Sequence, residues 1–195
     1  MNTKVSGVLI CVIVLAVFIT GALVYPSLGD FRLAFGLPIT LLMLWGLWAL
    51  LPAIDPIAKG FPGFRYVYDL FWILLSSFLA YSYALKLSKA LGVLQIDVLR
   101  ATLPALAALF FVISMLLPML RRNWFFGIRT PWTLSSDEDW MKTHQFARPL
   151  FGIASLLIFI GTFMPRIWGI GLLVGPIFLA IMASAIYSYI IFPRK

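Results

Sequence analysis

The side chains best suited to chemistry lie in one polar segment, Arg121 to Arg148. There, Asp137, Glu138 and Asp139 precede the only histidine, His144. Carboxylates and imidazoles transfer protons in many enzymes, and both also bind metals. However, His-Glu-x-x-His and comparable ligand spacings are absent, and the single cysteine lies in an apolar run. We therefore expect no metal site, no cofactor and no catalytic residue.

Helix capping is a simpler explanation for the carboxylates. Ser135 and Glu138 have the spacing of a capping box, in which each side chain accepts a hydrogen bond from the backbone N–H of the other residue. The sequence predicts a short interfacial helix over 136–147, which ends or bends at Pro149 because proline lacks the N–H that a helix requires.

The remaining polar and aromatic residues of this segment also have structural explanations. A lone histidine near a membrane surface is most often hydrogen-bonded within the structure, so we assign His144 no catalytic role. Trp132 and Trp140 suit the headgroup layer, and Arg129 is placed to stack on one of them.

The composition indicates which elements position these residues. The chain is 63% hydrophobic and only 11% charged over 195 residues, well outside the range of soluble globular proteins. Its net charge of +8 is scattered over the polar connections, so no basic stripe suggests direct nucleic-acid binding. We expect an all-α, polytopic membrane helical bundle that forms a single domain over residues 1–195.

Six apolar runs predict about six transmembrane helices, because crossing the hydrocarbon layer takes roughly 20 helical residues. The fourth-to-fifth connection, residues 121–148, would carry the short interfacial helix. The predicted spans are 5–25, 33–54, 67–87, 101–120, 148–165 and 167–192.

The distribution of Lys and Arg predicts the orientation. Ten fall on one side of the spans and five on the other, and the richer side is expected in the cytoplasm. This places both termini and the connection 121–148 in the cytoplasm. The ten are Lys4, Lys59, Arg65, Arg121, Arg122, Arg129, Lys142, Arg148, Arg194 and Lys195.

The last span contains a Gly-x-x-x-Gly pair, Gly171 and Gly175, and further along it Ala180, Ser184 and Ser188 are four residues apart from one another. Small residues repeated every four positions allow two helices to approach closely. Packing within the chain is the main expectation, and contact between two copies is the alternative.

Read as one motif, residues 123–136, followed by Trp140 and Lys142-Thr143-His144, closely resemble the signature of the SdpI family of bacterial membrane immunity proteins. Ile54-Asp55-Pro56 and Tyr68-Asp69 extend the resemblance more weakly. It assigns binding or conformational roles to Asn123, Gly127, Arg129, Thr130, Pro131, Trp132, Thr133, Leu134, Ser135, Trp140, Lys142, Thr143 and His144.

The resemblance implies a receptor and shield in the bacterial cell membrane that protects the cell against a secreted, membrane-active peptide toxin. In one branch of the family it also implies capture of a cytoplasmic transcriptional repressor. Two alternatives stay open. One is a membrane-embedded enzyme acting on a lipid or peptide, with Glu138 and His144 as the acid–base pair and Arg129 holding an anion. The other is a small transporter.

Overall fold

The computed structural model describes residues 3–57 and 62–192, and the side chains of 5–57 and 65–192. These ranges form seven α-helices and one 3-10 turn, and six of the helices are long and apolar enough to cross a membrane. The protein is therefore a multi-pass helical membrane protein, as its composition predicted. Lys59, Arg194 and Lys195, used for the orientation, lie outside the described residues, as does the side chain of Lys4.

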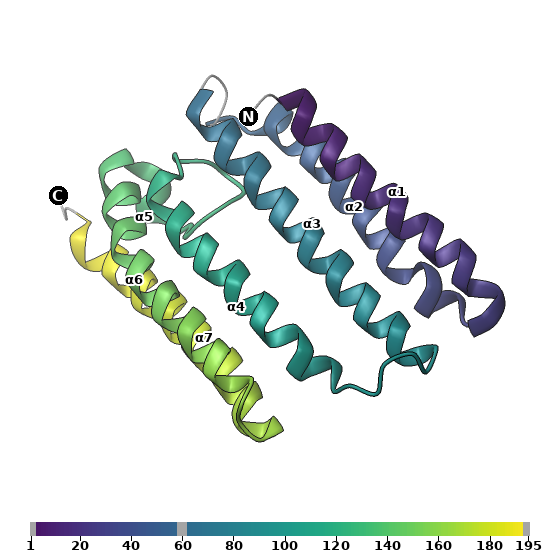
Figure 1. Cartoon of the computed structure of the whole chain (residues 1–195). Helices are drawn as coiled ribbons and strands as arrows, with labels where there is room; N and C mark the ends of the chain where they lie inside the picture. The colour runs from purple at the N-terminus through teal and green to yellow at the C-terminus, as the bar shows by residue number, and fades with distance from the viewer. Residues whose placement is uncertain (1–2, 58–61, 193–195) are drawn as a thin grey trace.

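The long helices run alternately up and down (Figure 1). The start of α1, the end of α2, the start of α3, the segment between α4 and α6 and the end of α7 lie at the same end of the bundle. The elements are α1 (Thr3–Leu28), α2 (Phe31–Ile54), α3 (Pro62–Ala90), α4 (Val98–Leu116), the 3-10 turn η1 (Leu117–Met119), α5 (Pro131–Ser135), α6 (Asp137–Gly161) and α7 (Arg166–Ile191).

Turns at the opposite end are closed by aspartates and glycines. Asp30 caps α2 by accepting from the N–H groups of Arg32 and Leu33, and Asp97 caps α4 in the same way. These carboxylates satisfy backbone donors that a helix start leaves free. Gly29 ends α1 with φ of 63°, a left-handed conformation that glycine adopts without strain.

The six long helices form two groups of three. α1, α2 and α3 pack on one another around one apolar cluster, and α4, α6 and α7 pack around two others. Contact between α3 and α4 brings the two groups together. At most 39% of any candidate span is buried inside the protein, so most of the apolar surface faces outward, as a lipid environment requires.

The predicted interfacial helix is not a separate element. Residues 137–161 form one continuous helix, α6, with Pro149 inside it. Proline is tolerated within membrane helices because neighbouring groups satisfy the backbone that it leaves free. The short helix of the fourth-to-fifth connection is instead α5, which starts at Pro131.

Close helix packing involves a different glycine pair from the one predicted. A Cβ atom placed on Gly171 or Gly175 would meet no atom within 4 Å. By contrast, a Cβ on Gly169 would lie 2.9 Å from the carbonyl oxygen of Gly161. The α6–α7 approach therefore depends on Gly161 and Gly169, and the prediction of packing within the chain at Gly171 and Gly175 was wrong.

Candidate functional site

The signature segment, defined as residues 121–144, begins with a turn organised by a buried amide. The Asn123 side chain accepts from the N–H groups of Phe125 and Phe126 at 2.9 and 2.6 Å. Its amide nitrogen donates to the carbonyls of Arg121 and Phe126 at 2.9 and 3.1 Å. Asn123 is fully buried, so both functional groups of the amide are used to fold this turn rather than to bind a ligand.

Two contacts join this turn to the first helix group. The N–H of Trp124 donates to Oδ2 of Asp55, directly after α2, at 3.0 Å. The Phe126 ring packs among aromatic residues of α3, with centroids 5.1 Å from Tyr68 and 5.2 Å from Phe71. Phe126 therefore anchors the segment to helix α3 inside the protein.

The next turn is built around His144. The N–H of Ile128 donates to its Nε2 atom at 3.0 Å, and Nδ1 lies 2.7 Å from the carbonyl oxygen of Trp140. Because Nε2 accepts, the ring is neutral and carries its proton on Nδ1, which donates to Trp140. Both nitrogens are thus occupied by backbone groups, and the ring is fully buried.

Gly127 allows the main chain to approach this imidazole. Its φ is 100°, and a Cβ atom there would lie 2.4 Å from Nε2 of His144. The Trp140 ring stacks on the imidazole with a centroid separation of 4.3 Å, and Trp140 Nε1 donates to the carbonyl of Leu120. Trp140 is only 2% exposed, so its prediction as a headgroup anchor was wrong.

Threonine hydroxyls fix the following turn. The hydroxyl of Thr130 caps α5 by accepting from the N–H of Thr133. In return, the hydroxyl of Thr133 accepts from the N–H of Thr130. The Thr133 hydroxyl also donates to the carbonyl of Ile128. The hydroxyls of Thr130 and Ser188 lie 3.0 Å apart. Because Ser188 is part of α7, this contact ties the signature segment to the last helix.

The predicted capping box of Ser135 and Glu138 does not form, and the prediction was wrong. Ser135 is the last residue of α5, and its hydroxyl donates to the carbonyl of Trp132. Ser136 is the extended residue that caps α6, and it accepts from the N–H of Asp139 at 3.2 Å. Glu138 instead pairs with Lys142 at 2.6 Å, one turn further along α6. Because Ser135 belongs to α5, the residue that caps α6 is Ser136.

The arginines of the signature segment have different partners. Arg122 pairs with Asp137 at 2.7 Å and donates to the carbonyl of Leu134. Arg129 does not stack on Trp132 or Trp140, since the cation–π contacts of the described residues are made by Arg65. It donates to the carbonyl of Trp124 at 2.6 Å. The side chain of Arg129 is exposed, so its charge is available to a ligand.

Two buried oxygen atoms on α6 lack a hydrogen-bond partner among the described residues: Oδ2 of Asp139 and the hydroxyl of Thr143. They are one helical turn apart, and the two residues are 4% and 0% exposed. An unsatisfied buried polar group costs free energy. The hydroxyl of Thr143 thus contrasts with that of Thr133, which is fully bonded.

A second buried polar cluster lies in the first helix group, around Asp69. Its carboxylate accepts from the hydroxyl of Ser6 and from Nε1 of Trp48, both at 2.9 Å. Nε of Arg65 lies 2.9 Å from Oδ1 of Asp69, which makes an ion pair, but the geometry of this contact is not that of a hydrogen bond. Arg65 and Asp69 therefore form an ion pair within α3, while the fully buried Asp69 also joins α3 to α1 and α2.

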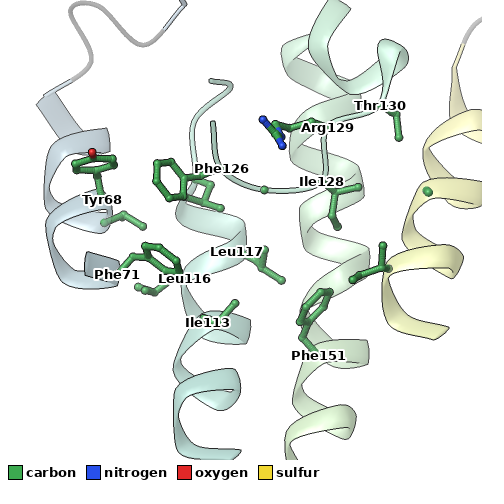
Figure 2. A pocket seen from close by; sticks show the side chains of 15 residues that line it. Tyr68, Phe71, Ile113, Leu116, Leu117, Phe126, Ile128, Arg129, Thr130 and Phe151 are labelled. Atoms are coloured by element: carbon green, nitrogen blue, oxygen red, sulfur yellow. The ribbon is translucent and has the colours of Figure 1, made fainter. Parts of the chain in front are cut away.

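An apolar pocket of about 400 Å³ lies between the two helix groups, below the signature segment (Figure 2). Helices α3, α4, α6 and α7 form its wall, and residues 126–130 cross one end. Its lining residues are Val67, Tyr68, Phe71, Ile113, Leu116, Leu117, Leu120, Phe126, Gly127, Ile128, Arg129, Thr130, Phe151, Ile181 and Ala185.

Most of the predicted residues therefore meet in one structure, but in different roles. Asn123, Gly127, Thr133, Trp140 and His144 hold the backbone, while Arg129 and Thr130 reach the pocket. The sequence did not indicate the aromatic and aliphatic pocket residues, because apolar residues in a membrane span look alike whether they face lipid, core or cavity. Among the described residues, no group of three or more His, Cys, Asp or Glu side chains is placed to hold a metal ion.

The fold and the site define a class: a multi-pass helical membrane protein with a hydrogen-bonded signature segment that joins two helix groups. Within that class, residues 119–190 match the SdpI/YfhL protein family. The match covers the whole signature segment together with α6 and most of α7, and confirms the resemblance found in the sequence. No curated protein and no solved structure matches the chain significantly.

Proposed function

We propose that this protein is a bacterial membrane immunity protein that protects the cell against a secreted, membrane-active peptide toxin. The observation that carries the proposal is the family match over residues 119–190. The protein sits in the bacterial cell membrane with both termini in the cytoplasm, and acts by binding and conformational change rather than by catalysis. Its partners are the bilayer, the toxin and a cytoplasmic protein such as a transcriptional repressor.

The contacts of the signature segment supply a mechanism. It is joined to α2 through Asp55, to α3 through Phe126 and to α7 through Thr130. A peptide bound within the bilayer shifts the two helix groups relative to each other, and these contacts transmit the shift to the signature segment. Its cytoplasmic surface, including Arg129, then changes its exposure to a partner, which is a shift between two populations of one structure.

The geometry gives little support to the enzyme alternative. An acid–base mechanism requires Glu138 and His144 to reach the same substrate, with Arg129 beside them. Instead, Glu138 is exposed and paired with Lys142, whereas both nitrogens of His144 face the backbone. Of these three residues only Arg129 lines the pocket. For a transporter, the buried carboxylate of Asp69 would be the notable feature, but it already binds Ser6 and Trp48.

The test is survival. A strain with the gene deleted is complemented with the wild-type protein or a variant and challenged with a panel of membrane-active peptides from neighbouring bacteria. We expect wild-type protein to restore resistance to at least one peptide, and Arg129→Gln and Trp140→Phe to reduce it at equal protein levels. Gln145→Ala, an exposed change on α6, is the control. If deletion and both substitutions leave sensitivity to every peptide unchanged, the proposal is wrong.

One further variant separates immunity from enzymatic activity. Glu138→Gln removes the acid that the enzyme alternative needs but leaves the buried part of the signature segment intact. Retained protection in this variant supports a binding mechanism. Complete loss of protection, at a normal protein level, would favour an acid–base reaction instead.

A further inference from the structure

The pocket between the helix groups combines an apolar interior with one cation. Most of its lining residues are aliphatic or aromatic, and among the polar ones the Tyr68 hydroxyl is bonded to the carbonyl of Trp48 at 2.8 Å. The volume of about 400 Å³ lies within the range of sites that hold small apolar ligands. The interior therefore offers contact to a hydrocarbon chain and little to a polar molecule.

Arg129 supplies the charge at this pocket (Figure 2). Its donation to the carbonyl of Trp124 fixes the guanidinium, but a neutral carbonyl leaves the positive charge uncompensated. The described ion pairs use Arg65, Arg122 and Lys142, and Arg129 is in none of them. A guanidinium with free N–H donors binds phosphate oxygens in a bidentate manner.

The position of Arg129 indicates where such a phosphate comes from. Arg129 lies between the end of α4 and the start of α6, at the end of the bundle where α2 also ends. Spans of this length place their ends near the headgroup layer. A lipid there can hold its phosphate near Arg129 while one acyl chain enters the apolar interior.

We propose that this pocket binds one acyl chain of an anionic phospholipid, with the lipid phosphate held by Arg129. The occupant is a component of the bilayer and is distinct from the toxin, so this inference goes beyond the proposed function. The bound chain fills the space between the two helix groups and stabilises their packing.

The experiment measures retained lipid. The full chain is reconstituted in vesicles of phosphatidylglycerol and phosphatidylcholine, extracted in mild detergent and analysed by native mass spectrometry. We expect phosphatidylglycerol to remain bound in preference to phosphatidylcholine. Arg129→Gln should reduce this preference about fivefold, the effect of one cation near an anionic lipid surface. Arg121→Gln, an exposed arginine that does not line this pocket, is the matched control and should retain the preference.

A second pair of variants tests the apolar interior. Ala185→Leu places extra volume in the pocket from α7 and should lower retention of both lipids. Ala183→Leu, an equally half-buried alanine of α7 that does not line the pocket, should not. Equal effects of Arg129→Gln and Arg121→Gln, or of the two alanine variants, would mean that only lipids of the outer shell are bound and would overturn the proposal.

A third measurement uses only the wild-type protein. Phosphatidylglycerol with a photoreactive acyl chain should label residues 113–130 and 181–185. Labelling confined to outward-facing residues such as Leu156 and Phe178 would contradict the proposal. None of the lipid measurements uses a toxin, so their failure leaves the immunity proposal standing, and failure of the survival test leaves the lipid site standing.

Discussion

The backbone N–H of Ile128 donates to Nε2 of His144 across 3.0 Å, so the only imidazole of the chain serves the main chain. On its other side the ring donates to the carbonyl of Trp140, four residues earlier in α6. His144 therefore links the extended part of the signature segment to α6. The same geometry removes both nitrogens from proton transfer, because neither one faces the pocket.

Replacing this imidazole should destabilise the protein. His144→Phe keeps an aromatic ring against Trp140 but leaves the buried N–H of Ile128 without an acceptor, at a cost of about 1–3 kcal/mol. We expect a lower melting temperature in detergent, followed by tryptophan fluorescence. Gln145→Ala, the exposed neighbour, serves as the control and should melt like wild type. A melting temperature of His144→Phe equal to that of wild type would show that this hydrogen bond contributes nothing to stability.

Gly127→Ala should be more damaging than an ordinary glycine substitution. At φ of 100°, and with Nε2 of His144 only 2.4 Å from the new Cβ, the change adds strain of about 1–3 kcal/mol as well as a steric clash. In Gly36→Ala, within α2, the new Cβ meets no atom within 4 Å, and helix propensity predicts a gain of about 0.5–1 kcal/mol. Melting temperatures should thus shift in opposite directions, and a fall of similar size in both variants would contradict the geometric argument.

The helices could be predicted because a membrane span has a simple requirement. About 20 apolar residues without charge satisfy it, and all six predicted spans overlap long helices of the structure. The continuity of α6 was harder to predict. A separate helix over 136–147 and a span from residue 148 were expected because Pro149 indicated a break or bend, whereas one helix runs through Pro149. Whether a proline ends a helix depends on its tertiary neighbours, which a single sequence does not contain.

The signature segment was found from the sequence, whereas the roles of its residues were not. Trp140 is of the residue type that anchors helices at the membrane interface. It is nevertheless buried, because Gly127 brings the main chain against His144 and the Trp140 ring. Asp55 was noted only as part of a resemblance, and its bond to the N–H of Trp124 joins residues 69 positions apart. Such long-range contacts leave no periodic pattern from which they could be predicted.

Two buried threonines of the signature segment should respond in opposite ways to the same substitution. Thr133→Val removes a hydroxyl that bonds the carbonyl of Ile128 and the N–H of Thr130, and should destabilise by about 1–3 kcal/mol. Thr143→Val removes a buried hydroxyl that has no partner among the described residues, and should leave stability unchanged or slightly higher. Unfolding in detergent measures both, and a large loss in Thr143→Val would indicate a ligand or a water on that hydroxyl.

The glycines of α7 allow packing within the chain to be separated from contact between copies. Gly169→Val would force a side chain against the carbonyl of Gly161, since even a Cβ lies 2.9 Å from that oxygen. We expect overpacking to cost about 1–3 kcal/mol and to lower the melting temperature. Gly171→Val, two residues further along the same helix, meets no atom within 4 Å at its Cβ and should melt like wild type.

Light scattering of purified wild-type and Gly171→Val protein then tests the remaining alternative, because a bulky residue at Gly171 would disrupt a Gly-x-x-x-Gly contact between two copies. A dimer lost in Gly171→Val would assign Gly171 and Gly175 to that contact, whereas an unchanged oligomeric state would mean that these glycines face lipid.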